Sequence, residues 1–172
     1  SNPPLLEWLG SPIRYLDNFG VADAIRSLLP TYYSPSSCIY HYLHMAQGNY
    51  RDYLKGEQVW HKKYFYVLRP LLAIKWIEQN LGVAPVAFPE LVDKMITDSV
   101  LRSEIETLVA AKLQGNELDY GPRNAIIGDF IASELLRLEH YRAEHKREAP
   151  PVPPLDALFQ KALSDVWQRP VC

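Results

Sequence analysis

The sequence is poor in cysteine and in long apolar runs, and it carries almost no net charge. Its two cysteines, Cys38 and Cys172, are too few and too far apart for a disulfide framework or a four-ligand zinc site, as expected in a reducing cytoplasm. No stretch approaches the roughly eighteen apolar residues of a membrane span, and no signal segment opens the chain. The formal net charge of -2 excludes a globally basic nucleic-acid binder. These absences predict a cytoplasmic protein with no membrane partner, on which any basic surface is local.

The chain also lacks the motifs of common phosphate-handling enzymes. It has no glycine-rich phosphate loop, no Walker sequence and no Gly-x-Ser-x-Gly elbow. It has no Asp-x-Asp or Asp-x-Glu pair, although two-metal phosphoryl transfer needs clustered carboxylates to hold Mg²⁺. Cys38, His41 and His44 spread over roughly 120° of a helix, which favours a packed cysteine and half-exposed histidines over a metal-dependent hydrolase. We expect no catalytic residue and no metal ligand in this chain.

What the sequence does contain is helical spacing. Hydrophobic residues make up 48% and charged residues 22% of the 172 residues, which excludes a disordered chain. Apolar positions recur every three or four residues, so the expected fold is all-α, a bundle of seven to eight helices. The helix expected over 57–80 is apolar around most of its circumference and should lie at the centre, with Pro70 marking a kink or a join. Pro30 should end the second helix. The expected helices are 3–9, 18–29, 35–54, 57–80, 89–96, 98–114, 124–145 and 155–167.

The two ends of the chain differ from its middle. It begins Ser-Asn-Pro-Pro without an initiator Met, as expected of a processed chain, of one with residual tag residues or of part of a longer polypeptide. Near the other end, the run Ala-Pro-Pro-Val-Pro-Pro at 149–154 is typical of a stiff polyproline spacer. We expect one helical domain over 1–146, followed over 147–172 by this spacer and a terminal helix.

The near-neutral total hides an uneven distribution of charge. Residues 51–75 contain six basic and two acidic side chains, whereas residues 86–119 contain three basic and seven acidic ones. At about 100° per residue, Lys62, Tyr66 and Arg69 share one narrow face of the expected central helix. Two cations with an aromatic ring between them could hold a triphosphate or a nucleic-acid backbone. The alternative is that these cations pair with carboxylates of the acidic helices, and the spacing alone leaves both open.

Six strings of the sequence together resemble one protein family. They are Ser1-Asn-Pro-Pro-Leu-Leu-Glu-Trp-Leu9, Ser11-Pro-Ile13, Ile39-Tyr-His-Tyr-Leu43, Asn49-Tyr-Arg-Asp-Tyr-Leu54, Lys62-Lys-Tyr-Phe-Tyr-Val-Leu-Arg-Pro-Leu-Leu-Ala73 and Trp76-Ile77. These strings resemble the C-terminal half of the YcgL/RlaP-type nucleotidyltransferases, proteins of the DNA-polymerase-β superfamily associated with RNA repair. The twelve residues from Lys62 to Ala73 are the most specific part, and the likeness runs from Asn2 to about Arg142.

The resemblance implies a helical domain of an enzyme that transfers NMP from an NTP to an acceptor, expected to be RNA. Its catalytic α/β domain, with the Mg²⁺-binding carboxylates, would precede this chain, which alone would then be inactive. The expected partners are therefore an NTP, RNA and the protein's own N-terminal catalytic domain. By the same likeness, the candidate contacts to nucleotide or acceptor are Lys62, Lys63, Tyr66 and Arg69, with His41, Asn49 and Tyr50 as a second set.

A different class of function remains open at this point. The chain could be a helical module without enzymatic activity, whose Tyr- and Trp-bearing face and Pro-rich tail bind a protein partner. Binding that weakens steeply with salt would indicate a phosphate ligand, whereas salt-insensitive binding to a protein would indicate the module.

Overall fold

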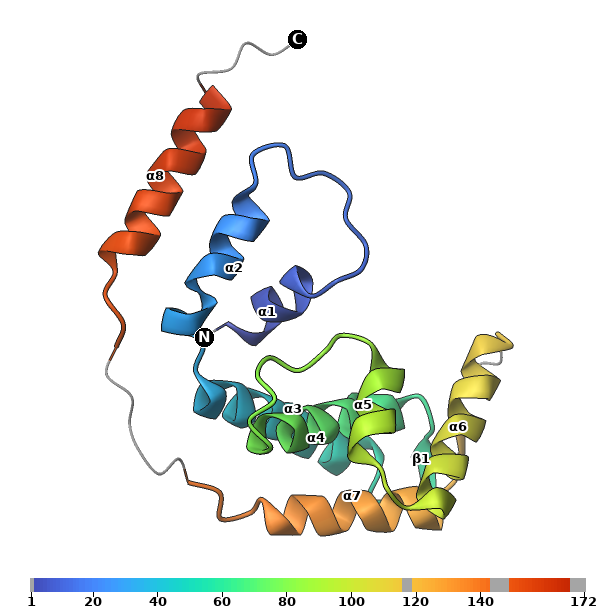
Figure 1. Cartoon of the computed structure of the whole chain (residues 1–172). Coiled ribbons are helices and arrows are strands. Elements are labelled where there is room, and N and C mark those ends of the chain that lie inside the picture. The colour runs from blue at the N-terminus through green and yellow to red at the C-terminus, as the bar shows by residue number, and fades with distance from the viewer. Residues whose placement is uncertain (1, 116–118, 143–148, 168–172) are drawn as a thin grey trace. The chain divides into compact units, whose positions relative to one another are not determined.

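The computed structural model describes residues 2–115, 119–142 and 149–167. These residues form eight helices and one two-stranded sheet, which confirms the expected all-α class (Figure 1). The chain divides into two compact units. Unit 1 comprises Ser1–Ser34 with Glu144–Cys172, and unit 2 comprises Pro35–Ala143. The domain boundary expected between residues 146 and 147 stays a prediction.

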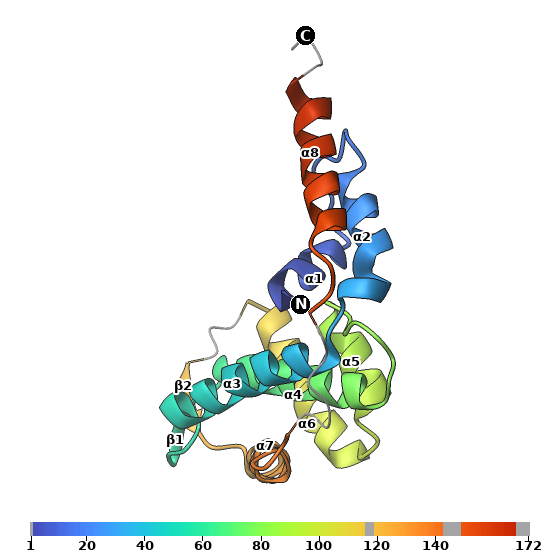
Figure 2. The ribbon, with the colours of Figure 1, turned by 90° about the vertical axis from the view of Figure 1, so that its left-hand side faces the viewer.

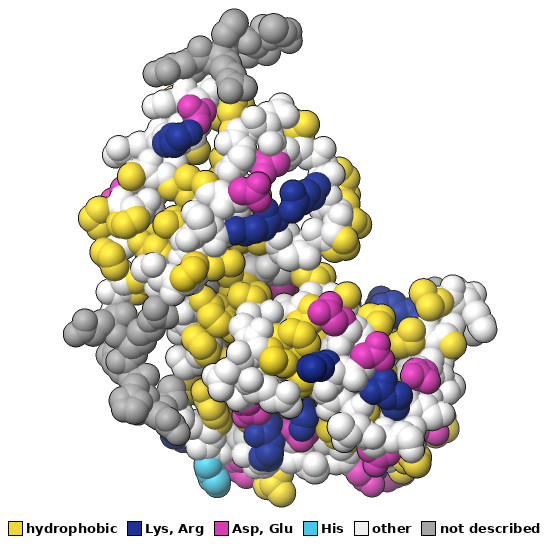
Figure 3. Space-filling model, viewed as in Figure 1, with side chains coloured by type: hydrophobic (Ala, Val, Ile, Leu, Met, Phe, Trp, Pro, Cys, Tyr) yellow, Lys and Arg dark blue, Asp and Glu magenta, His cyan; other side chains and the backbone are white. Residues whose placement is uncertain are grey.

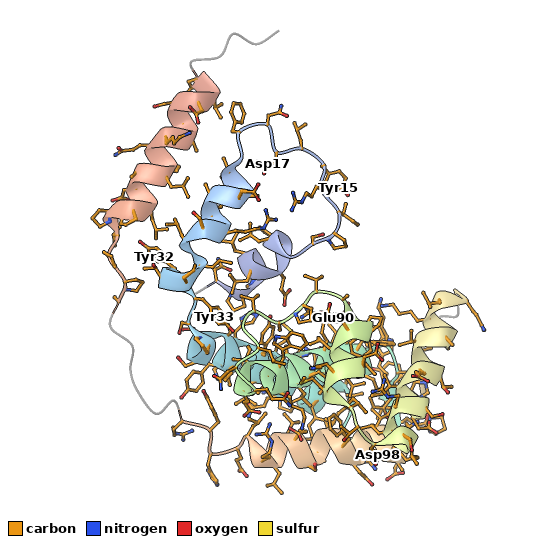
Figure 4. All side chains as sticks on the ribbon, in the orientation of Figure 1. Tyr15, Asp17, Tyr32, Tyr33, Glu90 and Asp98 are labelled. Atoms are coloured by element: carbon orange, nitrogen blue, oxygen red, sulfur yellow. The ribbon has the colours of Figure 1, made fainter. Side chains whose placement is uncertain are left out.

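Unit 1 contains three helices, α1 (Pro3–Leu9), α2 (Val21–Tyr32) and α8 (Pro153–Trp167). Asn2 caps α1, because its Oδ1 accepts a hydrogen bond from the Leu5 amide at 3.3 Å. Arg26 of α2 donates to the Leu9 carbonyl at 2.7 Å and so joins α2 to the end of α1. Tyr32, labelled in Figure 4, donates to the Pro151 carbonyl at 2.5 Å just before α8.

The expectation that α2 stops at Pro30 is wrong, since this proline lies inside the helix. Proline removes only its own amide hydrogen bond, and position 30 falls in the last turn. The next turn still closes, because the Tyr33 amide donates to the Leu29 carbonyl at 2.8 Å. The helix therefore continues to Tyr32 before it ends.

Apolar side chains of unit 1 remain exposed on α8 and on the segment that joins α1 to α2. The space-filling view shows apolar surface over this part of the chain (Figure 3). No helix in the described residues is both long and apolar enough to cross a membrane. The exposed apolar residues are Ile13, Tyr15, Leu16, Leu155, Phe159, Val166 and Trp167.

Unit 2 is built around α4 (Lys63–Glu78), which is the central helix that the sequence led us to expect. This helix packs against α3 (Pro35–Tyr53), α5 (Phe88–Met95) and α7 (Ala125–Arg137), and α6 (Ser99–Leu113) packs against α7. Figure 2 shows α3 and α4 side by side. Pro70 lies inside α4, which remains one helix on both sides of it. The buried residues of α4 are Tyr64, Val67, Leu68, Pro70, Leu71, Leu72, Ala73, Ile74 and Ile77.

The first part of the expected helix 57–80 is a strand instead. Strand β1 (Gln58–Trp60) pairs antiparallel with β2 (Tyr120–Pro122), with Val59 opposite Gly121. Val59 is fully buried whereas Gln58 is exposed, and this alternation is that of a strand. The amides of His61 and Arg123 extend the ribbon by donating to the carbonyls of Asp119 and Glu57 at 3.1 and 3.0 Å. A three-residue strand is too short to show its alternation in the sequence.

Side chains cap the starts of α6 and α7. The Asp98 carboxylate, labelled in Figure 4, accepts from the Val100 and Leu101 amides, and Asn124 accepts from the Ile127 amide at 3.0 Å. The helix expected over 124–145 ends earlier, at Arg137, because Leu138 is the last buried apolar residue before the charged stretch. Residues 143–148 lie outside the described part of the chain.

Candidate functional site

The side chain of Lys63 lies at the centre of a polar and aromatic group in unit 2. Its Nζ is 3.3 Å from Oδ1 of Asn49 and donates a hydrogen bond to it. The same ammonium lies 4.2, 5.1 and 4.7 Å from the ring centres of Tyr53, Trp60 and Tyr66. All three distances fall within the range of cation–π attraction. We call these five residues the Lys63 cluster.

Three consecutive elements bring the Lys63 cluster together. Asn49 and Tyr53 come from the last turns of α3, Trp60 ends β1, and Lys63 and Tyr66 belong to the first turn of α4. Because α3 and α4 lie side by side, the end of one helix faces the start of the next, and the short strand β1 lies between them. Lys63 and Tyr66 are three residues apart on a helix, which places their side chains on the same face.

An aromatic stack continues from the Lys63 cluster onto the β ribbon. Trp60 and Tyr120 are paired residues of β1 and β2, and their rings are nearly parallel, at 16°, with centres 5.9 Å apart. The Tyr53 ring meets Trp60 edge-on at 5.6 Å. Trp60 is half-buried, whereas Tyr120 is 62% and Tyr66 46% exposed. The outer member of the stack therefore presents a ring to solvent.

The start of α4 carries two adjacent lysines. Lys62 is exposed and occupies the N-cap position, no side chain caps the helix, and its first turn contains no acidic residue. Across the described ranges, no carboxylate forms an ion pair with Lys62 or Lys63. The positive end of the helix dipole repels the charges of Lys62 and Lys63. An anion bound there would be attracted by the dipole and by the two lysines.

Other cations of the basic stretch are already engaged with carboxylates. Lys75 lies 3.0 Å from Glu134, and Arg51 lies 2.7 Å from Asp52. The hydrogen bond from Arg51 lowers the pKa of Asp52, and the charge of Lys63 acts in the same direction. Of the two cations for which the ion-pair alternative was raised, Lys62 and Arg69, Lys62 forms no ion pair within the described residues.

The seven predicted contact residues do not all gather at one place. The structure brings Asn49, Lys63 and Tyr66 into direct contact, with Lys62 next to them in the chain. Arg69 is half-buried and six residues beyond Lys63, which is about 9 Å along the helix axis. The expected face of Lys62, Tyr66 and Arg69 leads onward to the fully buried Ala73, so the helix passes from surface to core.

The second predicted set is divided as well. His41 lies eight residues before Asn49 on α3, about 12 Å along the helix axis, with its ring edge-on to Tyr42 at 5.6 Å. Tyr50 is half-buried and follows Asn49 on α3. Of this set, only Asn49 belongs to the Lys63 cluster.

Sequence reasoning missed Tyr53, Trp60 and Tyr120. The signal for the first two was present, because aromatic residues at 53, 60 and 66 bracket Lys63 in the sequence. Placing Trp60 in a helix hid its role, and the pairing that brings Tyr120 beside it joins residues sixty positions apart.

The buried residue Tyr64 holds the start of α4 in place. Tyr64 follows Lys63, is 1% exposed and accepts a hydrogen bond at its hydroxyl oxygen from the Asn124 amide at 2.9 Å. Burial raises the pKa of Tyr64, and this outweighs the opposite effects of that hydrogen bond and of the Arg123 charge. The phenol therefore stays neutral, and its role is to fix the start of α4 against the start of α7.

The described residues contain no group of three or more His, Cys, Asp and Glu side chains that could hold a metal ion. On α3, Cys38 is buried, His41 is half-buried and His44 is exposed. A separate hollow of about 410 Å³ lies among α4, α6 and α7, and its polar lining includes Lys75, Asp98 and Asp129. Lys75 and Asp129 are both ion-paired there, so this hollow offers no open cation.

The fold and the Lys63 cluster define a helical protein with a basic, aromatic surface. Comparison with known proteins identifies its family. The family model described as "RlaP: RNA repair pathway DNA polymerase beta family" matches residues 1–161, and the chain belongs to this family. It is also 40% identical, over 169 residues, to the uncharacterized protein YcgL of Bacillus subtilis (strain 168). No solved structure matches the chain.

These matches also correct the extent of the resemblance. The likeness was expected to end near Arg142, but the family match continues to residue 161, within α8. The alignment with YcgL covers 98% of this chain and 65% of the relative. The chain thus spans about two-thirds of the curated relative's length. The matches support the family but not the expectation that the chain is its C-terminal part.

Proposed function

We propose that this chain is the helical substrate-binding part of a nucleotidyltransferase, which transfers NMP from an NTP to an RNA acceptor. The observation that carries the proposal is the Lys63 cluster at the start of α4. Lys62 and Lys63 would contact phosphate oxygens, and the aromatic rings would hold the rest of the nucleotide or RNA. Membership of a family linked to RNA repair and to polymerase β supports this assignment.

Charge is the physical reason for placing phosphates at this site. A phosphate at the start of α4 would meet the positive end of the helix dipole and two ammonium groups that have no carboxylate partner within the described residues. The rings around Lys63 stabilise its charge without neutralising it, since cation–π attraction does not transfer a proton. The hydrogen bond to Asn49 at 3.3 Å fixes the direction of the ammonium.

The catalytic step itself is proposed to belong to another part of the protein. Mg²⁺ is implied by polymerase-β-type chemistry, but the described residues provide no cluster of carboxylates that fits it. In the proposal, this chain binds and orients substrate, while a catalytic domain outside it holds the metal and transfers the nucleotidyl group. We derive no metal-dependent step from the present residues.

Salt-dependent binding tests the proposal directly. The chain would be titrated with fluorescent single-stranded RNA and, separately, with an NTP, at several salt concentrations. We expect binding to weaken steeply with salt, and Lys62→Ala to lower the slope of log K against log salt by about 0.7 because one phosphate contact is lost. Lys94→Ala is the matched control, since Lys94 is an exposed lysine of unit 2 on α5, distant in sequence from the cluster.

Two results would count against the proposal. One is the absence of salt-dependent binding to both RNA and NTP. The other is an equal loss for Lys62→Ala and Lys94→Ala, which would assign the effect to net charge rather than to the start of α4.

A groove between α5 and α6 favours a second candidate, the protein-interaction module. It has a volume of about 200 Å³ and is lined by Phe88, Val92, Val109 and Leu113, of which Leu113 is 82% exposed. Exposed apolar grooves are common binding sites for partner helices. Salt-insensitive binding to a protein, together with no binding to RNA or NTP, would establish this candidate instead.

A further inference from the structure

We infer that the stacked rings of Trp60 and Tyr120 bind an unpaired base of single-stranded RNA. The inference rests on the proposed function and names the form of RNA that the site accepts. The motivating geometry is the near-parallel pair of rings, 16° and 5.9 Å apart, on a two-stranded ribbon beside two lysines without carboxylate partners in the described chain.

The open surface of the stack is the ring of Tyr120. Trp60 is covered by Tyr53, by the ammonium of Lys63 and by Tyr120 itself, and it is half-buried. Tyr120 is 62% exposed, so its ring is accessible to a ligand in solution. A base placed on Tyr120 would extend the stack by one ring, and every base has a π-face that can do so.

The ribbon holds the stack at a fixed distance from the lysines. Trp60 pairs with Tyr120 in register, and the next amide, that of His61, donates to the Asp119 carbonyl at 3.1 Å. Lys62 and Lys63 follow directly in the chain. The His61 ring also contacts the Pro122 carbonyl through Nε2 at 2.9 Å, so both strands are tied to the segment that begins α4. A base on Tyr120 would therefore lie beside the segment that leads into Lys62 and Lys63.

The arrangement favours a single strand over a duplex. Bases inside a duplex are stacked on one another, and their faces cannot reach a protein ring, whereas unpaired bases can be splayed out. The local charge sets a limit on affinity, because Asp52, Glu57 and Asp119 are exposed in the same region. With few phosphate contacts, the stacked base should provide a large share of the binding.

An oligomer without bases separates stacking from charge. The probes are a fluorescent uridine oligomer and an abasic ribose-phosphate oligomer of the same length, both titrated by anisotropy at fixed salt. We expect Tyr120→Ala to weaken binding of the uridine oligomer by about tenfold, in the range measured for one stacked base, and to leave the abasic oligomer unchanged. Tyr120→Phe, which keeps the ring, should bind both probes as the unaltered chain does.

Two further variants complete the test. Lys62→Ala should weaken both probes to a similar degree, because it removes a phosphate contact. Tyr120→Leu keeps an apolar contact with Trp60 but has no π-face. It should therefore weaken binding of the uridine oligomer as much as Tyr120→Ala does, without the loosening of the ribbon that alanine could cause. Melting temperatures of all variants identify any loss that comes from unfolding.

The outcomes distinguish the inference from the function on which it rests. If the uridine oligomer binds with the expected salt dependence but Tyr120→Leu has no effect, stacking is refuted and the phosphate site stands. Equal losses of both probes in Tyr120→Leu would refute stacking in the same way. If the unaltered chain binds neither oligomer, the proposed function fails, and the stacking inference fails with it.

Discussion

Replacing Glu134 by Gln should weaken the contact between α4 and α7 in a predictable way. Glu134 lies on α7 and, at 8% exposure, is the buried charged residue of the described chain. Its carboxylate accepts from Lys75 Nζ at 3.0 Å and from Arg137 Nε and Nη2 at 3.0 and 2.8 Å. Arg137 also donates two hydrogen bonds to Glu78 of α4, both of 2.9 Å.

The expected cost follows from what each partner retains. Breaking a fully buried ion pair costs about 3–5 kcal/mol, because the remaining charge has no compensation. Here Arg137 keeps both bonds to Glu78, and the Lys75 side chain is 26% exposed, so water replaces part of its lost partner. Hydrogen bonds to charged groups contribute about 1.5–3 kcal/mol. We therefore expect Glu134→Gln to lower the free energy of unfolding by about 2–3 kcal/mol at neutral pH.

The same substitution should change the pH dependence of stability. Burial alone would raise the pKa of Glu134, but the hydrogen bonds and charges of Lys75 and Arg137 outweigh it and hold that pKa below its ordinary value of 4.5. A carboxyl whose pKa is lower in the folded state stabilises the fold above its unfolded pKa, and this stability is lost as pH falls through the folded pKa. Glu134→Gln should therefore lose less stability than the unaltered chain below about pH 4.5.

Urea denaturation followed by circular dichroism measures both effects. The unaltered chain and Glu134→Gln would be compared at neutral pH and at several acidic values. Glu139→Gln serves as the control, since Glu139 is exposed just beyond α7 and should change stability by less than about 0.5 kcal/mol. Equal costs for the two substitutions, or parallel acid dependence of the unaltered chain and Glu134→Gln, would refute the role assigned to Glu134.

Three other substitutions test the core, the ribbon and a helix cap, each by urea denaturation. Leu71→Ala removes a fully buried side chain of α4 and should lower the free energy of unfolding by about 2–5 kcal/mol. A loss no larger than that of an exposed Leu→Ala substitution would contradict the place of Leu71 in the core. Gly121→Ala puts a methyl group 2.7 Å from Cε1 of His61, so it should destabilise the ribbon by about 1–3 kcal/mol and shift the His61 ring signals in NMR spectra. Asp98→Ala removes the cap of α6 and should cost about 1 kcal/mol, whereas Asp98→Asn should retain most of that stability.

Local patterns in the sequence predicted most of the helices. Polar residues precede three of the apolar helical patterns, and Asn2, Asp98 and Asn124 each accept an amide hydrogen bond there in the structure. The apolar circumference of α4 correctly indicated the central helix, because burial of such a helix requires neighbours on every side.

The β ribbon could not be predicted in this way. Its strands gain their hydrogen bonds from each other across a long stretch of chain, and three residues carry too little pattern to reveal a strand. The contact of His61 with the Pro122 carbonyl joins residues 61 positions apart. The site was only partly predictable for the same reason. Helical spacing indicated Lys62, Lys63 and Tyr66, but Tyr120 is brought to the site by strand pairing.

The order of the chain in unit 1 has a consequence for synthesis on the ribosome. Unit 1 is composed of the first and last segments of the chain, and the hydrogen bond from Tyr32 to Pro151 spans 119 residues. All of unit 2 leaves the ribosome between these two segments, so it can fold before α8 exists. The hydrogen bond from Tyr32 to the Pro151 carbonyl can form only after the last segment has been made, and closing so long a loop costs entropy. A chain truncated before α8 should therefore keep unit 2 and lose the completed unit 1.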